Sequence, residues 1–238
     1  MITKTNPGHD SAYQGPVVTS SFSFAGREIR LVRPADPDRL LDDLSVHALN
    51  RQDDYMPYWA YLWPGAHLLA EAVDREPWQG GTEALEIGCG LGLAGLVALG
   101  RGLRVRFTDY DEAPLRFAAR SAELNGFPPG TFSTARLDWR DLPEERYPII
   151  LGADVLYESK LVPLVADLLA RLLAPDGLAL IAGPYRVAAE GLEACLKERG
   201  LVQEIEPVRA ISEIGPVRGS LHRIRRAHSQ HAQSQVQH

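Results

Sequence analysis

Apolar residues recur through the middle of the chain in short runs that alternate with longer amphipathic segments. The short runs predict strands over Ala84–Ile87, Val105–Thr108, Phe132–Leu137, Tyr147–Ala153 and Gly177–Ala182. The longer segments, which end at helix-stop residues, predict helices over Leu93–Gly100, Ala113–Asn125, Lys160–Leu173 and Ala188–Arg199. Alternation of strands with helices predicts an α/β fold, in which a parallel sheet carries helices on both faces.

The pattern changes at both ends of this core. Upstream, the alternating segments Val17–Phe24 and Glu28–Val32 predict a hairpin that turns at Ala25-Gly26. Two helices are expected after it, over Asp36–Leu49 and Ala66–Val73. Downstream, Val202–Ile211 and Ser220–Arg225 predict a hairpin-like pair at the sheet edge, which brings the sheet to seven strands. We expect a flexible N-terminus over residues 1–16, an N-terminal extension over 17–65, the main domain over 66–226 and a disordered polar tail over 227–238.

Composition limits the class of protein without identifying it. The chain has 238 residues, enough for one domain with a full core, and its net charge of −6 argues against broad nucleic-acid binding. No stretch approaches the roughly 20 apolar residues that span a bilayer, and the N-terminus lacks the apolar core of a secretory signal. Two cysteines without a disulfide framework predict a reducing, cytoplasmic location and no membrane association. The oligomeric state is not indicated.

The segment from Ala84 to Asp111 carries the strongest signal for a ligand site. A predicted strand leads into Gly88-Cys89-Gly90-Leu91-Gly92, and the helix behind this loop offers unpaired N–H groups at its start. Asp109 closes the next strand, at about the 20-residue spacing where an acid usually holds ribose hydroxyls. This arrangement predicts a nucleoside-binding βαβ unit.

Two kinds of nucleoside ligand are consistent with this unit. Residues 90–95 match G-x-G-x-x-G, the fingerprint of dinucleotide sites. However, Gly88 precedes that match, and Glu86 lies near the strand end, where an acid suits a positively charged ligand such as the amino acid end of S-adenosylmethionine. We therefore favour S-adenosylmethionine and keep a dinucleotide as the alternative. Asp109 could also cap the next helix, although Asp111 fits the cap at least as well.

Further candidates follow the other strands, whose carboxyl ends meet at the ligand edge of an open sheet. Asp138 and Trp139 offer a polar group and an aromatic wall for adenine, unless the tryptophan only packs under a loop. Asp154 and Tyr157 follow the fourth strand, where a methyl acceptor is expected, and Ala153 is small enough for the cofactor's sulfur to lie close. The alternative is that Asp154 caps a helix and that Tyr157 packs in the core.

The densest aromatic stretch, YMPYWAYLWPG, runs from Tyr55 to Gly65. Aromatic rings attract cations such as a sulfonium or an alkylated ammonium, by about 0.5–2 kcal/mol each. The alternative is that these rings pack the following helix onto the sheet, and both interpretations hold if Trp63 faces the cofactor. His47 and His67 flank the stretch, and we expect both to be structural rather than catalytic bases.

Taken together, four motifs resemble a known family: PYWAYLWPGA (57–66), LEIGCGLGLAG (85–95), TDYD (108–111) and ADVLYE (153–158). They are similar to the class I (seven-β-strand) methyltransferases that depend on S-adenosylmethionine. The similarity is to the protein-lysine methyltransferase branch that includes the enzyme modifying the β-subunit of electron-transfer flavoprotein. It covers about residues 55–184 and implies a doubly wound, Rossmann-like sheet. The chain departs from the branch at residues 183–186 and in the N-terminal hairpin, regions that usually differ between substrates.

Carried onto this sequence, the resemblance implies a cofactor site formed by Trp63, Glu86, Gly88, Cys89, Gly90, Gly92, Asp109 and Trp139. It also implies that Asp154 and Tyr157, the D-x-x-Y element, shape a lysine channel. Asp138 and Ala153, and Tyr110 of the TDYD motif, complete the candidate set. We therefore expect methyl transfer from S-adenosylmethionine to a protein lysine, with a small-molecule acceptor as the alternative and no metal ion. A module that only binds the cofactor, and a dinucleotide oxidoreductase, are the remaining hypotheses.

Overall fold

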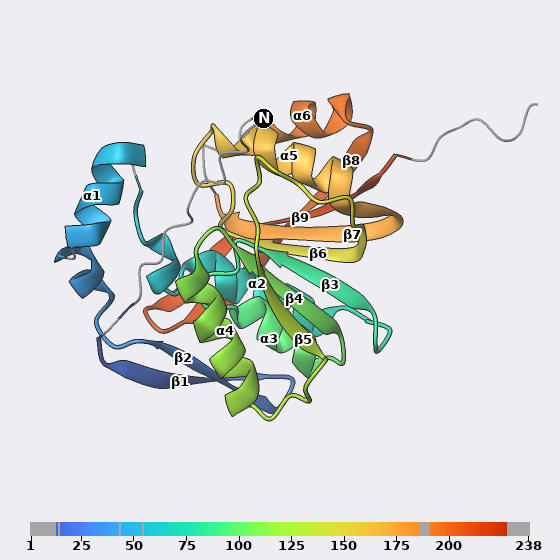
Figure 1. Ribbon diagram of the computed structural model, residues 1–238. Coiled ribbons are helices and arrows are strands. Elements are labelled where there is room, and N and C mark those ends of the chain that lie inside the picture. Colours follow the sequence, from blue (N-terminus) through green and yellow to red (C-terminus); the bar gives the residue numbers. More distant parts are fainter. Residues whose placement is uncertain (1–12, 14, 43, 54, 186–190, 228–238) are drawn as a thin grey trace, which may run out of the picture.

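A central sheet organises the molecule. The computed structural model describes residues 13, 15–42, 44–53, 55–185 and 191–227. The sheet has seven strands in the order β5-β4-β3-β6-β7-β9-β8 (Figure 1). These are β3 (Glu83–Ile87), β4 (Arg104–Asp109), β5 (Phe132–Arg136), β6 (Tyr147–Ala153), β7 (Leu173–Pro184), β8 (Leu201–Ser212) and β9 (Gly215–Arg226). Strands β3 to β7 are parallel, and β9 is antiparallel to both of its neighbours. The predicted fold class is confirmed.

The strand order changes direction at β3, which pairs with β4 on one side and with β6 on the other. In open α/β sheets, ligands bind beyond the carboxyl ends of the strands at this reversal. The ends of β3, β4 and β6 therefore define the edge at which a site is expected.

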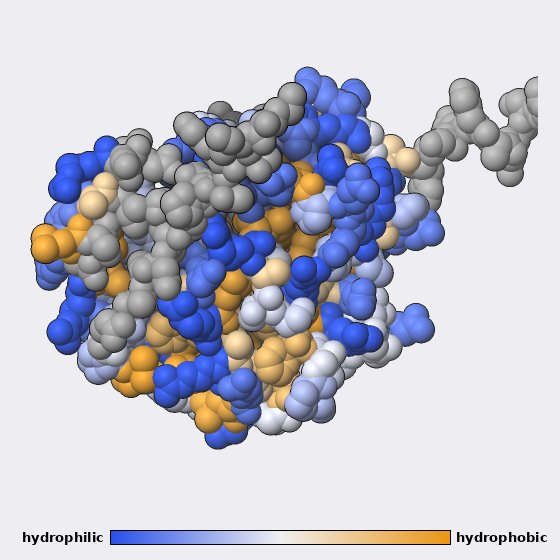
Figure 2. Space-filling model, viewed as in Figure 1, coloured by the Kyte–Doolittle hydropathy of each residue, from blue (hydrophilic) through white to orange (hydrophobic). Residues whose placement is uncertain are grey.

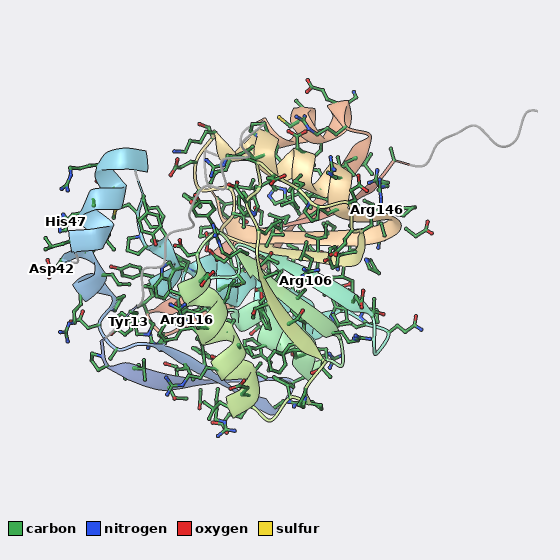
Figure 3. All side chains as sticks on the ribbon, viewed as in Figure 1. Tyr13, Asp42, His47, Arg106, Arg116 and Arg146 are labelled. Atoms are coloured by element: carbon green, nitrogen blue, oxygen red, sulfur yellow. The ribbon has the colours of Figure 1, made fainter. Side chains whose placement is uncertain are left out.

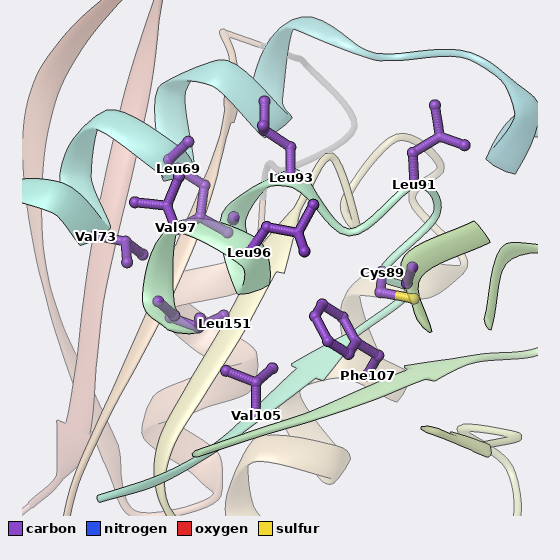
Figure 4. Close-up of a cluster of buried hydrophobic side chains, with 14 of the residues drawn as sticks. Leu69, Val73, Cys89, Leu91, Leu93, Leu96, Val97, Val105, Phe107 and Leu151 are labelled. Carbon is purple, nitrogen blue, oxygen red and sulfur yellow. The ribbon is translucent and has the colours of Figure 1, made fainter. Parts of the chain in front are cut away.

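Helices cover both faces of the sheet (Figure 1). One face carries α2 (Pro64–Arg75), α3 (Leu93–Gly100) and α4 (Glu112–Leu124), and the other carries α5 (Leu161–Leu172) and α6 (Leu192–Glu198). Because successive strand side chains point to opposite faces, each buried strand contributes to two separate clusters. In β6, Leu151 belongs to the cluster under α2 to α4, and Ile150 belongs to the cluster under α5 and α6. Figure 4 shows side chains of α2 and α3 against Val105, Phe107 and Leu151 of the sheet.

The predicted N-terminal hairpin is confirmed. Strands β1 (Val17–Phe24) and β2 (Arg27–Pro34) pair around Ala25 and Gly26, whose φ angles of 45° and 77° suit a two-residue type I′ turn. The hairpin forms a separate sheet outside α3 and α4 (Figure 1). Side chains of α4 hold it there, since the Val32 N–H donates to Ser121 Oγ at 2.9 Å.

The segment that follows the hairpin differs from the prediction of one helix over Asp36–Leu49. A 3-10 helix, η1 (Pro37–Asp42), precedes α1 (Leu44–Asp53), and a second short 3-10 helix, η2 (Tyr58–Ala60), precedes α2. Proline is tolerated only in the first turn of a helix, which explains why η1 begins at Pro37. Helix α2 begins at Pro64 rather than Ala66 for the same reason, since proline is favoured at the first helical position.

The two C-terminal strands form the predicted hairpin, and this pair lies at one edge of the sheet. Strand β9 lies between β7 and β8, so that only β8 is at the edge of the sheet. Helix α6 begins at Leu192, and residues 186–190, which include the start of the helix predicted over Ala188–Arg199, lie outside the described residues. The tail from residue 228 and most of the predicted flexible N-terminus lie outside them as well.

The face seen in Figure 2 is mainly hydrophilic, with small apolar patches that include one over the α1 region. None of the helices in the described part of the chain has the length and apolar character needed to cross a bilayer. Figure 3 places Asp42 and His47 on the α1 side of the molecule, well away from Arg106 and Arg146.

His67, the second histidine that flanks the aromatic stretch, is buried in α2. Its ring lies edge-on to Phe22 at 5.3 Å, and burial lowers its pKa.

Candidate functional site

The loop after β3 has the backbone that its glycines predict. Gly88, Gly90 and Gly92 have φ angles of 54°, 50° and 79°, a region that side chains other than glycine rarely adopt. The turn is closed by hydrogen bonds from the Cys89 N–H to the Thr108 carbonyl at 2.9 Å and from the Gly92 N–H to the Cys89 carbonyl at 2.8 Å. The three glycines therefore present backbone rather than side chains at the end of β3.

Two tryptophans flank the glycine loop, Trp139 with its ring and Trp59 with its backbone. A Cβ placed on Gly88 would lie 3.2 Å from Cζ2 of Trp139, and one placed on Gly90 would lie 3.6 Å from the Trp59 carbonyl oxygen. Cys89 turns the other way: its side chain is buried beside the apolar cluster of Figure 4, and burial raises the pKa of its thiol. Its predicted contribution to a cofactor site is therefore through the backbone.

Asp109 lies at the end of β4, directly beside the glycine loop. Its Oδ2 accepts a hydrogen bond from the Gly90 N–H at 2.9 Å, and its Oδ1 accepts one from the Asp111 N–H at 3.3 Å. Burial raises the pKa of the carboxyl to about 6, although the backbone N–H groups counteract the rise. Asp109 is therefore mostly ionised at neutral pH, and backbone N–H groups hold its carboxylate in place at the end of β4.

Asp111 occupies the N-cap position of α4, as predicted, but its side chain makes no capping hydrogen bond to the helix. Its Oδ2 instead accepts a hydrogen bond from the Tyr55 hydroxyl at 2.5 Å. This contact ties the start of the aromatic stretch to the end of β4. The alternative role for Asp109 as the helix cap is not adopted.

Glu86 is 2% exposed and points from β3 toward α3. Its Oε2 accepts a hydrogen bond from the Gly95 N–H at 3.2 Å, and a Cβ on Gly95 would overlap this oxygen. Burial raises the pKa of Glu86 to about 8, so the group is mostly protonated at pH 7. The visible role of Glu86 is to anchor the start of α3, and its contact with a ligand's ammonium stays a prediction.

Asp138 and Trp139 follow β5 on the far side of Asp109. Trp139 packs against Gly88, as described above, and Asp138 forms an ion pair with Arg140 at 2.7 Å. The Tyr110 ring contacts two guanidinium groups, that of Arg140 at 5.5 Å from the ring centre and that of Arg136 at 5.7 Å. Of the predicted pair, Trp139 therefore lies against the glycine loop, and the Asp138 carboxylate is held by Arg140.

Asp154 follows Ala153 at the end of β6 and has a φ angle of 54°, which is unusual for a residue other than glycine. Its Oδ2 accepts a hydrogen bond from the Gly65 N–H at 2.6 Å, at the start of α2. A side chain on Gly65 would overlap this oxygen, so glycine is needed there. Asp154 therefore does bond a helix N-terminus, as the alternative interpretation proposed, but the helix is α2 rather than the one that follows it.

Three partly exposed aromatic rings lie next to each other beside Asp154. Tyr58 is 40% exposed, Trp63 is 37% exposed and Tyr157 is 39% exposed. Tyr58 meets Tyr157 edge-on at 5.5 Å and Trp63 at 5.9 Å, and the Trp63 indole N–H donates to the Tyr58 carbonyl at 2.7 Å. We call these three residues the aromatic patch. The interpretation of Tyr157 as a core side chain is wrong.

The two halves of the candidate site lie close to one another. Ile87 pairs with Gly152 across β3 and β6, and a Cβ placed on Gly88 would lie 3.4 Å from Cγ1 of Val155, the residue after Asp154. The structure thus brings the glycine loop and Asp109 together with Asp154 and Tyr157 at one edge of the sheet, as the strand-end rule predicts.

Sequence reasoning missed three residues that shape this edge: Gly65, Tyr58 and Arg140. Gly65 and Tyr58 belong to the aromatic stretch, where nothing in the local pattern says which residues meet Asp154 and Tyr157. Arg140 carried a signal, since a basic residue two positions after an acid at a strand end is well placed to pair with it.

The fold of the chain has counterparts among solved structures. Magnesium protoporphyrin IX methyltransferase (ChlM) from Synechocystis PCC 6803, solved with bound SAM, has a TM-score of 0.53 and 16% sequence identity. The match covers 67% of this chain and 77% of that one, and it concerns the fold.

The family follows from the sequence comparisons. A family model described as "Lysine methyltransferase" matches residues 60–191. Protein N-lysine methyltransferase METTL21A of Danio rerio is 31% identical over 133 residues, 52% of this chain and 60% of that protein. EEF1A lysine methyltransferase 3 of Mus musculus is 30% identical over 182 residues, 74% of this chain and 78% of that protein. The chain belongs to the lysine methyltransferase family.

Proposed function

We propose that the protein transfers a methyl group from S-adenosylmethionine to a lysine of a protein substrate. The observation that carries the proposal is the pair of carboxylates at neighbouring strand ends. Asp109 is bonded to the glycine loop, and Asp154 stands beside the aromatic patch. One half suits a nucleoside with an adjacent cationic centre, and the other suits an amine. Membership of the lysine methyltransferase family supports both assignments.

The cofactor half fits S-adenosylmethionine in three respects. The loop offers backbone without side chains at Gly88 and Gly90, Asp109 offers an ionised carboxylate to the ribose hydroxyls, and Trp139 supplies a ring next to the loop. We assign Glu86 to holding α3 against this loop. Ala153, on β6 beside Asp154, adds no bulk at the junction of the two halves.

The acceptor half must bind an amine and leave it uncharged. A free lysine has a pKa of about 10.4, and a partly apolar surrounding lowers it by disfavouring the charged form. The aromatic patch supplies this surrounding, while the Asp154 carboxylate, which is fixed in place by the Gly65 N–H, orients the amine N–H. When bound, S-adenosylmethionine supplies a methyl group that is already activated on sulfur. The task left to these residues is alignment and exclusion of water.

The test is methyl transfer from tritiated S-adenosylmethionine into a lysate, counted separately in protein and in small molecules. We expect a discrete labelled protein whose modified lysine is found by mass spectrometry, with labelling lost in Asp154→Ala and kept in Asp176→Asn, an exposed change far from the site. Label confined to small molecules would replace the lysine proposal by the small-molecule alternative. An absence of label with intact cofactor binding would favour a binding module.

We also propose a cytoplasmic location. Cys89 and Cys195 are both free thiols, which is the state expected in a reducing compartment. Fractionation of cells that produce the tagged protein, with a cytosolic marker as the reference, tests this location.

A further inference from the structure

A single arginine holds the acid that follows β5. Arg140 donates three hydrogen bonds to the Asp138 carboxylate: Nε to Oδ1 at 2.8 Å, Nη2 to Oδ2 at 2.7 Å and the backbone N–H to Oδ1 at 3.0 Å. The two side-chain bonds form the bidentate fork that matches a guanidinium to a carboxylate. Free rotation of the carboxylate would break two of these bonds at once, so the group is fixed in orientation.

The same guanidinium also stands over Tyr110, at 5.5 Å from the ring centre. Arg136 lies against this ring as well, at 5.7 Å, and its Nε donates to the Tyr110 carbonyl at 3.1 Å. Tyr110 directly follows Asp109, and the Leu137 N–H bonds the Asp109 carbonyl at 2.9 Å. Arg140 therefore contacts both Tyr110, which follows Asp109, and Asp138, which follows the residue bonded to Asp109.

The bonds leave Asp138 with limited capacity. A carboxylate offers about four acceptor positions, two on each oxygen. Arg140 uses both positions on Oδ1 and one on Oδ2, so one position on Oδ2 is available for an outside donor. An exocyclic amino group provides such a donor, whereas a ring carbonyl in the same place would bring two acceptors together.

We propose that Arg140 is a positioning residue that selects an aminopurine at this site, because it aims the remaining acceptor of Asp138 at the amino group of the base. The proposal rests on the proposed cofactor, S-adenosylmethionine. The hydrogen bonds from Arg140 also lower the pKa of the Asp138 carboxyl, so it remains an acceptor at physiological pH. Both side chains are partly exposed, and such a pair contributes little to stability. If replacement of Arg140 changes the preference between two ligands, a loss of stability therefore does not explain the change.

The test compares two ligands that differ in one group, S-adenosylhomocysteine and S-inosylhomocysteine, which carries a carbonyl where adenine has its amino group. Their dissociation constants are measured by calorimetry on the full chain and on Arg140→Ala, Arg140→Lys and Arg136→Ala. Arg136→Ala is the matched control, because Arg136 is exposed and contacts Tyr110 but donates no hydrogen bond to Asp138 among the described residues.

We expect the wild-type protein to prefer the adenosine ligand by roughly 10- to 100-fold, the range of one hydrogen bond to a charged group. Arg140→Ala should reduce this preference at least about fivefold, with a thermal midpoint within about 2 °C of wild type. Arg140→Lys should restore the preference only in part, since an ammonium lacks the fork. Arg136→Ala should keep it.

An unchanged preference in Arg140→Ala, or an equal loss in Arg136→Ala, would overturn the role of Arg140 and leave the proposed function standing. A wild-type protein that binds the adenosine ligand without preference over the inosine ligand would overturn the role of Arg140 as well. A wild-type protein that binds neither ligand would overturn the proposed cofactor, and with it this inference.

Discussion

Replacement of Glu86 by glutamine tests the consequence of burying an acid in the first strand of the core. Burial raises the pKa of Glu86 from 4.5 to about 8. In the unfolded chain the group ionises near its ordinary value, so between these two pKa values the unfolded state loses a proton that the folded state keeps. Stability from this group is therefore greatest below about pH 4.5, falls as the pH rises, and levels off above about pH 8.

The magnitude follows from the interval between the two pKa values. Each pH unit within it changes the free energy of unfolding by about 1.4 kcal/mol. Between pH 5 and pH 8 the wild-type protein should lose about 3–4 kcal/mol of stability through Glu86. A glutamine cannot ionise, and its amide oxygen can still accept the hydrogen bond from the Gly95 N–H. The Glu86→Gln protein should therefore lose about 3–4 kcal/mol less than wild type over this range.

The assay is urea unfolding followed by the fluorescence of the four tryptophans, at pH 5 and pH 8. Other groups titrate in this range, so the quantity of interest is the difference between variant and wild type at each pH. Glu83→Gln is the matched control, because Glu83 opens the same strand but is exposed. It should follow wild type. If Glu86→Gln also follows wild type, the carboxyl is ionised in the folded protein and the reasoning from burial fails.

Three further predictions concern the site. Affinity for S-adenosylhomocysteine should fall as the pH drops through about 6, because Asp109 gains a proton there and can no longer accept from both ribose hydroxyls. Calorimetry should show that Asp109→Asn removes this pH dependence and weakens binding about 10- to 100-fold at pH 7.5. Asp154→Asn should lower kcat about 100-fold with little change in cofactor affinity. The fold should be kept, since the amide can still accept from Gly65 and asparagine tolerates a positive φ. Equal losses of kcat and of cofactor affinity would show that Asp154 belongs to the cofactor half. Gly65→Ala should destabilise the protein by about 1–3 kcal/mol in urea unfolding, because the added methyl overlaps Asp154 Oδ2, and wild-type stability would mean that α2 can shift away.

The parts of the fold that sequence predicts are those set by local periodicity. Parallel strands β3, β4 and β6 are short apolar runs, and their helices end at glycine or proline signals that act over a few residues. The position of β9 is different. Whether the final strand lies at the edge or between β7 and β8 depends on pairings with Ala179–Pro184, which no local pattern in β9 specifies.

The candidate site divides in the same way. Asp109 and Asp154 could be placed at the ligand edge because strand ends converge there whatever their partners are. Their hydrogen-bond partners could not be foreseen. Asp154 bonds Gly65, which lies 89 residues away, and Tyr55 bonds Asp111 across 56 residues. Such contacts are created by packing, so they become visible only when the helices and the extension are in position.

The place of β9 also has a consequence for how the chain must fold. The last strand in sequence fills an interior position of the sheet, so β7 has an open edge until residues 215–226 have been synthesised. The turn that precedes β9 also meets the beginning of the chain, where Glu213 pairs with Arg33 of the first hairpin at 2.8 Å. During synthesis the nascent protein therefore exposes an unpaired strand edge, the kind of surface on which chains associate wrongly. Closure of the sheet is therefore a late event, and it brings the turn before β9 against the N-terminal hairpin.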